Sequence, residues 1–117
     1  MEKTALGRDG ESLAREYLER KGFHFLRRNY KRLHGEIDLI MEQGSWLVFV
    51  EVKTRRSFQY GMPAEAVTPA KQRHIRYCAE LYFSECGIET RKSRFDVVEV
   101  LLLPGRAPRI RHLENAF

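Results

Sequence analysis

The sequence predicts a single α/β domain in which two main helices flank a mixed central sheet, in the order α-β-β-β-α-β-β. Three observations lead to this prediction. The 117 residues fit one domain with one core, since domains of about 100–150 residues are the commonest. Two segments carry helix-capping signals, and five shorter runs are apolar and strand-like. The chain contains no repeat or low-complexity segment, so residues 1–117 are expected to form one unit.

The first helix is expected between residues 4 and 21, with Thr4 as its N-cap and Gly22 as the C′ residue. Glu11 lies beside the apolar stripe of this helix. That position lets its carboxylate approach the sheet, but an ordinary place on the helix surface fits the spacing about equally well. The stripe consists of residues that recur at helical spacing: Leu6, Gly10, Leu13, Ala14, Tyr17 and Leu18.

Three strands are expected next, and the last two should form a hairpin: 24–30, 35–40 and 46–53. A two-residue loop at 43–44 would set Asp38 opposite Phe49 and Glu36 opposite Glu51, with all four side chains on one face of the sheet. Asp38 and Glu51 would then be diagonal neighbours. A three-residue loop would instead place Asp38 on the opposite face from Glu51.

Four charged residues interrupt the apolar strands of this hairpin: Glu36, Asp38, Glu51 and Lys53. A charge in such a run costs on the order of several kcal/mol unless it is paired or binds a metal. Strand alternation puts Glu51 and Lys53 on one face, and likewise Glu36 and Asp38. Two carboxylates a few ångströms apart repel, and a divalent cation keeps both ionised. Because no Cys or His joins this cluster in sequence, the oxygen ligands favour Mg²⁺ or Mn²⁺ over zinc.

A polar and aromatic loop at 56–63 leads to the second helix, for which Thr68 is the expected N-cap and Pro69 the first residue. The helix should end near Glu85, before Gly87. Lys71 and Gln72 lie in its first turn, where free N–H groups favour an anion such as a DNA phosphate; a purely structural cap fits this position equally well. Four residues of the helix should face the core: Ile75, Cys78, Ala79 and Tyr82.

The last two strands are expected at 95–102 and 109–112, separated by a turn at 104–105. Asp96 lies within the first of these strands, where an edge or cap position is more usual than a role as a ligand. Cys78 and Cys86 are eight residues apart on one helix, too far to form a disulfide, and are expected to be buried thiols. The four histidines share no metal-ligand spacing.

The net charge of +5 and pI of about 9.5 are typical of nucleic-acid-binding proteins. Basic residues flank the acidic hairpin, as a phosphate-binding groove around a metal site would require. A merely solvated surface is the alternative. Trp46, Phe58 and Tyr60 could stack on unpaired bases, although core packing is the usual role of a tryptophan. The candidate nucleic-acid-binding residues are Arg28, Lys31, Arg55, Arg56, Lys71 and Gln72.

No apolar stretch approaches the ~20 residues that a membrane helix needs, and no apolar segment of a secretory signal follows the first residues. We therefore expect no membrane partner and a cytoplasmic location. The sequence leaves the oligomeric state open, and a homodimer is compatible with it.

Asp38, followed on the next strand by Glu51-Val52-Lys53, resembles the signature of the PD-(D/E)xK nuclease superfamily. No proline precedes Asp38; the residue two positions before it is Glu36. Over nearly the whole chain the sequence also resembles the YraN family of small bacterial proteins, which is assigned to that superfamily. Six motifs carry this second resemblance: 7–14 (GRDGESLA), 29–31 (NYK), 35–38 (GEID), 49–55 (FVEVKTR), 94–98 (RFDVV) and 115–117 (NAF).

The resemblance implies a restriction endonuclease-like fold and metal-dependent hydrolysis of phosphodiester bonds in DNA, with branched, Holliday-junction-like DNA as a candidate substrate. Asp38, Glu51 and Glu11, with the Val52 carbonyl, would bind Mg²⁺ or Mn²⁺, and Lys53 would be catalytic together with Asp38 and Glu51. A non-catalytic module that binds nucleic acid or a protein is the alternative. We predict that Asp38, Glu51 and Lys53 lie in one cleft on one face of the sheet.

Overall fold

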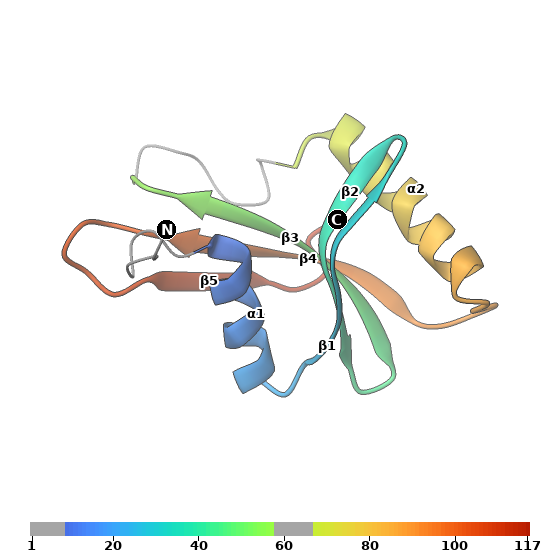
Figure 1. Cartoon of the computed structure of the whole chain (residues 1–117), viewed down its shortest axis with the longest axis horizontal. Coiled ribbons are helices and arrows are strands. Elements are labelled where there is room, and N and C mark those ends of the chain that lie inside the picture. Colours follow the sequence, from blue (N-terminus) through green and yellow to red (C-terminus); the bar gives the residue numbers. More distant parts are fainter. Residues whose placement is uncertain (1–8, 58–66) are drawn as a thin grey trace.

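Two helices cover opposite faces of a five-stranded sheet in the computed structural model, which describes residues 9–57 and 67–117 (Figure 1). The order α-β-β-β-α-β-β and the α/β class are as predicted. The elements are α1 (Gly10–Arg20), β1 (His24–Arg32), β2 (Gly35–Gln43), β3 (Trp46–Arg55), α2 (Pro69–Glu85), β4 (Ser93–Leu101) and β5 (Arg109–Leu113).

The strands lie in the sheet in chain order, from β1 to β5. Neighbours are antiparallel except for β3 and β4, which are parallel. Parallel neighbours need a long crossover connection, and the segment that contains α2 supplies it. The sheet is therefore mixed, as expected, and the crossover brings the start of α2 close to β2 and β3.

Alternate residues of β3 pack into two separate cores. Leu47 and Phe49 belong to the core under α2, whereas Val48 and Val50 belong to the core under α1. All four are buried, so both faces of this central strand are covered, which explains its nearly continuous apolar sequence. The predicted core residues of α2 are all buried: Ile75, Cys78, Ala79 and Tyr82.

Helix α1 begins later than the sequence suggested. Asp9 is the N-cap, and its side chain accepts a hydrogen bond from the Glu11 N–H at 3.0 Å. The prediction of Thr4 as the N-cap was wrong; Thr4 itself lies outside the described residues. Asp is a stronger N-cap than Thr, because its carboxylate accepts from the exposed N–H groups and favours the positive end of the helix dipole. Gly22 follows the helix with φ +93°, as expected for the C′ residue.

Helix α2 has the predicted ends. The Thr68 side chain accepts from the Lys71 N–H at 3.2 Å and Pro69 is the first helical residue, so the capping prediction is confirmed. Cys86 forms the C-cap and is exposed, which corrects the expectation of a buried thiol there. Cys78 is buried, and both cysteines are free.

The register of the β2–β3 hairpin differs from the prediction by one residue in each strand. Gln43 pairs with Trp46, so the two-residue loop is 44–45 rather than 43–44. Gly44 has φ +58° at the first loop position, where a type II′ turn needs glycine. The loop still contains two residues, so the predicted faces of Asp38 and Glu51 are unaffected. This register would bring Asp38 opposite Glu51 rather than diagonal to it.

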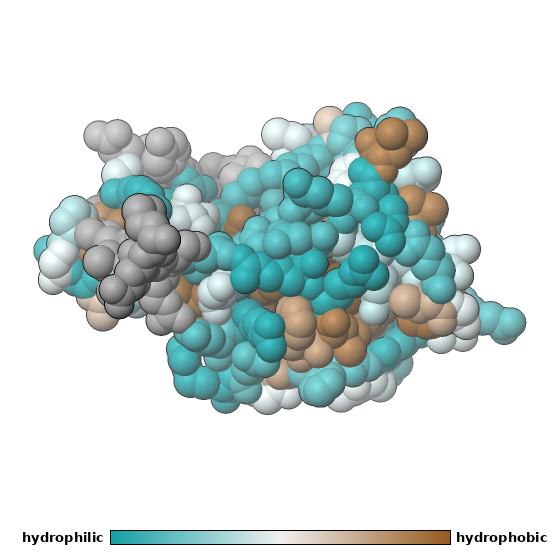
Figure 2. All heavy atoms as spheres, viewed as in Figure 1, coloured by the Kyte–Doolittle hydropathy of each residue, from teal (hydrophilic) through white to brown (hydrophobic). Residues whose placement is uncertain are grey.

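Hydrophilic side chains cover most of the centre of the surface seen in Figure 2, over β1 and β2. Hydrophobic atoms show at the tip of the β1–β2 hairpin, where Leu33 is 90% exposed. Trp46, for which core packing was the default, is 37% exposed at the start of β3. Phe58 and Tyr60 lie outside the described residues.

Candidate metal and nucleic-acid site

The sheet forks at Asp38. Pairing between β2 and β3 ends at Leu39 and Val50, one residue short of Asp38. Ile37 packs into the α2 core and Leu39 into the α1 core, although residues two apart in a regular strand share a face. The side chains of β2 therefore switch from one face of the sheet to the other at Asp38. Beyond the fork, the Val52 N–H donates to Asp38 Oδ2 at 2.8 Å in place of a backbone carbonyl.

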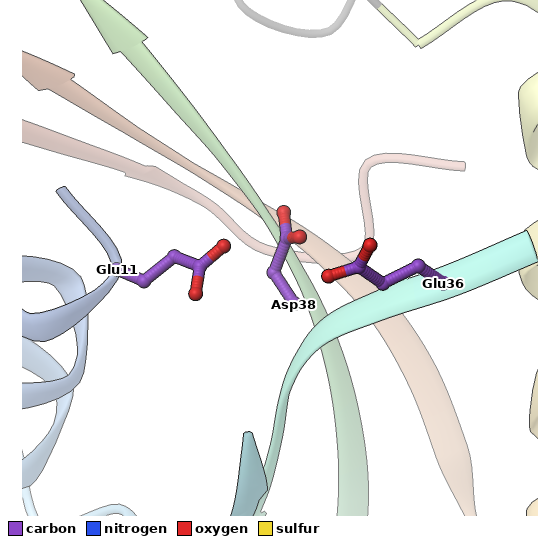
Figure 3. Close-up of side chains that lie close together, drawn as sticks. All are labelled: Glu11, Glu36 and Asp38. Carbon is purple, nitrogen blue, oxygen red and sulfur yellow. The ribbon is translucent and has the colours of Figure 1, made fainter. Parts of the chain in front are cut away.

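Three carboxylates converge at this fork. Glu11 comes from the first turn of α1, and Glu36 and Asp38 come from β2; one oxygen of each lies within 4.8 Å of the others (Figure 3). Glu11 thus takes the sheet-facing position, the first of the two alternatives that its spacing allowed. Gly10 permits this close approach, because a Cβ atom there would lie 1.9 Å from Thr54 Oγ1 of β3.

Glu51 lies on the other side of the fork, among cations. Its side chain is 6% exposed, and its Oε1 lies 3.1 Å from Lys71 Nζ and 3.7 Å from Lys53 Nζ. Asp38 and Glu51 both line a cleft of about 190 Å³ between the sheet and α2. The geometric prediction therefore holds for the two acids, which share a cleft. Lys53 does not line this cleft and approaches it only through Glu51. The full lining is Gly35, Glu36, Asp38, Glu51, Lys71, His74 and Ile75.

The crowding of acids changes how readily they ionise. Burial raises the pKa of Asp38 to about 8, and the neighbouring charges of Glu51, Glu11 and Glu36 act in the same direction. The hydrogen bond from Val52 opposes this shift. Burial also raises the pKa of Glu11, with Glu36 as the next cause. The free protein therefore keeps a proton in the cluster at neutral pH.

The two lysines of the cleft differ. Burial lowers the pKa of Lys53, and the nearby Lys71 adds to the effect. Burial would lower the pKa of Lys71 as well, but its contacts with Lys53 and Glu51 outweigh burial and raise it. Lys71 is thus the firmer partner of Glu51, and the Lys53 ammonium is the one that gives up its proton more readily.

The donor set of the fork suits a hard divalent cation. Glu11, Glu36 and Asp38 offer only carboxylate oxygens, which Mg²⁺ and Mn²⁺ prefer. A divalent cation would also offset the burial and the repulsion that together raise the pKa of Asp38. Glu51 would have to exchange Lys71 for the cation. The predicted Val52 ligand was its carbonyl, whereas the contact seen in the structure is from its N–H to Asp38.

The predicted nucleic-acid-binding residues fall into two groups. Arg28 and Arg55 are held within the fold: Arg28 Nε lies 3.1 Å from Glu11 Oε1 and Arg55 Nε lies 2.5 Å from Glu99 Oε2. Arg28 also pairs with Asp9, which ties the start of α1 to β1. Their charges are largely balanced, so neither is well placed as an open phosphate contact.

The other four candidates lie nearer the surface. Lys31 and Arg56 are exposed, and Lys31 Nζ lies 3.9 Å from Glu36 Oε2. Lys71 projects from α2 into the cleft. The Gln72 side chain donates to the Val67 carbonyl at 3.0 Å. Its amide therefore caps the start of α2, which is the structural role named as the alternative to phosphate binding.

Sequence reasoning did not assign three residues that the structure brings to the site. Glu36 was predicted to share a face with Asp38 and Glu51, but whether it belongs to the site was left open. His74 lines the cleft one helical turn after Lys71, so helical spacing could have indicated it. Asn29 contacts two of the acids, and no sequence pattern indicates its conformation.

Asp96 is a structural residue rather than an edge or cap residue. Strand β4 lies between β3 and β5, and Asp96 is fully buried. Its carboxylate accepts hydrogen bonds from Arg94 Nε at 2.9 Å and from the Asn115 N–H at 3.0 Å. It also contacts His112 Nε2 at 2.7 Å. Burial alone would raise the pKa of Asp96, but these bonds hold it below its ordinary value.

Residues 10–100, which carry the fork, both helices and most of the sheet, match the model of a family described as Uncharacterised protein family UPF0102. The chain belongs to the UPF0102 family. This is the YraN family that the six sequence motifs indicated, so that prediction is confirmed.

Relatives in this family match the chain almost from end to end. A UPF0102 protein of Rhodococcus jostii (strain RHA1) is 49% identical over 113 residues, which cover 97% of this chain and 96% of the relative. One from Geobacter sulfurreducens is 46% identical over 112 residues, which cover 96% of this chain and 88% of the relative. One from Caldicellulosiruptor saccharolyticus is 42% identical over 118 residues and the full length of both. Neither described helix is long and apolar enough to cross a membrane.

Proposed function

We propose that this UPF0102 protein is a metal-dependent endonuclease that hydrolyses phosphodiester bonds of DNA in the cytoplasm. The observation that carries the proposal is the fork at Asp38, which gathers Glu11 and Glu36 on one side and Glu51 with Lys53 on the other. A domain that only bound DNA would gain nothing from several acids in a basic protein, because they repel phosphate. Branched DNA is the first substrate to test.

Each side chain has a distinct role in the proposed reaction. Glu11, Asp38 and Glu51, with the Val52 carbonyl, would hold Mg²⁺ or Mn²⁺. When bound, such an ion lowers the pKa of a water and neutralises phosphate oxygens. Lys53 is half-buried beside Glu51, where its ammonium would orient the attacking water or offset the negative charge of the transition state.

The phosphodiester backbone would lie over the exposed cations around the cleft. Lys31 lies on the β1 side and Lys71 on the α2 side, so a strand crossing the cleft would meet both. Arg28 and Arg55 would act indirectly, since their ion pairs hold Glu11 and the end of β3 in place. Two copies would be needed to cut both strands of a branched substrate at once, and light scattering with and without DNA would measure whether a homodimer forms.

Cleavage of branched, flapped and single-stranded DNA, with Mg²⁺ and Mn²⁺ in separate reactions, tests the proposal. We expect Lys53→Ala to slow cleavage by about 10²–10³-fold, the scale observed when one electrostatic group that stabilises a transition state is removed. Lys92→Ala is the matched control and should cut at the wild-type rate, since Lys92 lies just before β4, beside the start of β3 and away from the site. Tight binding without cleavage by the wild type would favour a binding module instead.

Salt should weaken DNA binding steeply, because each phosphate contact contributes about 0.7–0.9 to the slope of log K against log salt. Lys31→Ala and Lys71→Ala should each reduce that slope by about this amount. Arg55→Ala is the comparison: its partner is Glu99, so we expect it to lower stability and leave the slope unchanged. Fluorescence anisotropy at several salt concentrations measures the slopes. Equal slopes in all four proteins would show that these lysines form only a solvated surface.

A further inference from the structure

Asn29 of β1 links two of the acids at the fork. In the amide orientation that its neighbours assign, the nitrogen donates to Glu11 Oε1 at 2.9 Å and to Glu36 Oε1 at 3.0 Å, and the oxygen accepts from Arg28 Nε at 3.3 Å. The opposite orientation of the amide would face its oxygen toward two carboxylates and its NH₂ toward a guanidinium. Only the first orientation satisfies every donor and acceptor.

The backbone at Asn29 is unusual for a strand. Its φ is +54°, in the left-handed region that costs an L-residue about 1–2 kcal/mol. The residues on either side pair normally with β2, Arg28 with Leu39 and Tyr30 with Ile37. Asn29 therefore lies across from Asp38. Asparagine tolerates this conformation better than most residues, so one residue type meets both the backbone and the side-chain requirement.

An amide suits this position because it is neutral. Three carboxylates whose oxygens lie within 4.8 Å repel one another. Arg28 and Lys31 already lie 3.1 Å from Glu11 and 3.9 Å from Glu36, and a further cation between the two acids would compete with a metal. An asparagine NH₂ has two N–H donors, one for Glu11 and one for Glu36, and it leaves the negative charge of both in place.

We infer that Asn29 is a positioning residue: its amide holds Glu11 of α1 and Glu36 of β2 toward Asp38, and so adds Glu36 to the metal site as a fourth carboxylate beside Glu11, Asp38 and Glu51. The inference rests on the proposed function for the metal, but the placement of the two glutamates can be measured without it.

Two substitutions separate the backbone role of Asn29 from its side-chain role. Asn29→Gly keeps the left-handed conformation accessible and removes the amide. Asn29→Asp keeps the size and conformation but replaces the donor by another carboxylate. Asn115→Gly is the matched control, since Asn115 also has a positive φ, +51°, and lies at the far end of the chain. Its N–H bond to Asp96 is retained in that variant.

Calorimetric titration of the full chain with Mn²⁺ and Mg²⁺ gives the first measurement. We expect Asn29→Gly to weaken Mn²⁺ binding about 10-fold or more, the usual cost of losing a group that orients metal ligands. Asn115→Gly should bind as the wild type does. Asn29→Asp should lower the unfolding temperature of the metal-free protein at pH 8. Adding Mn²⁺ should raise the unfolding temperature of Asn29→Asp by more than it raises the unfolding temperature of the wild type.

Crystal structures of the metal-free wild type and Asn29→Gly give the second measurement. We expect the Glu11 and Glu36 carboxylates to converge on Asp38 in the wild type and to move apart in Asn29→Gly. If they move apart while the wild type binds no metal, the positioning role stands and the proposed function fails. Unmoved carboxylates together with wild-type Mn²⁺ affinity in Asn29→Gly would overturn the inference.

Discussion

Replacing Asp38 by asparagine should reduce metal-dependent cleavage by about 10³-fold or more, because the change removes the carboxylate at the centre of the fork. Asp38 lies near both Glu11 and Glu36 and shares a cleft with Glu51, so it connects all three of the other acids. The asparagine oxygen can still accept from the Val52 N–H, which preserves the local fold. A loss of cleavage would therefore reflect the lost charge rather than a collapsed site.

DNA binding should survive in the same variant or become tighter. Asp38 is largely protonated in the metal-free protein at neutral pH, so its replacement removes little repulsion of phosphate there and more above pH 8, and Lys31 and Lys71 remain in place. Binding to a branched DNA, measured without metal, should give an equal or lower Kd than the wild type. Glu80→Gln, on the exposed side of α2, is the control for a lost surface charge and should leave both cleavage and binding unchanged. Cleavage by Asp38→Asn at the wild-type rate would place any activity elsewhere or in a contaminant.

The faces of the sheet could be predicted from sequence, but the pairing register could not. Strand alternation requires only that the hairpin loop have an even number of residues, and the true loop at 44–45 meets this condition as well as the predicted one at 43–44. Asp38 and Glu51 therefore share a face in either register. The choice between the two loops depends on which position adopts positive φ, and Gly44 does so at the first position.

Contacts between segments distant in sequence explain the features of the site that could not be predicted. Arg28 and Arg55 belong to basic runs that looked like phosphate contacts, but each meets a carboxylate far away in sequence, Glu11 and Glu99. Lys71 likewise meets Glu51, which depends on how the crossover returns α2 to the sheet. The left-handed conformation of Asn29 arises from the packing around it. None of these four arrangements has a local sequence signal.

The stability of the metal-free protein should fall as pH rises from about 4 to about 8, and Asp38→Asn should remove much of that dependence. Asp38 loses its proton near its ordinary pKa of about 3.9 when unfolded, but with a pKa of about 8 when folded. Between these values the folded state holds the extra proton, so each pH unit costs up to about 1.4 kcal/mol of unfolding free energy. The advantage of Asp38→Asn over the wild type should thus be smallest near pH 4 and largest above pH 8.

Urea unfolding in EDTA at several pH values measures this difference, with Glu80→Gln as the control that should track the wild type. For Asp96→Asn, the stability difference from the wild type should change with pH in the opposite direction, because the pKa of Asp96 is lowered in the folded state. The Asp96 carboxylate stabilises the fold above its ordinary pKa, and that contribution is lost on acidification. Mn²⁺ should abolish the pH penalty of the wild type, since a bound cation favours the ionised acids. A wild type whose stability stays level from pH 5 to pH 8 without metal would show that Asp38 ionises near its ordinary pKa in the folded protein.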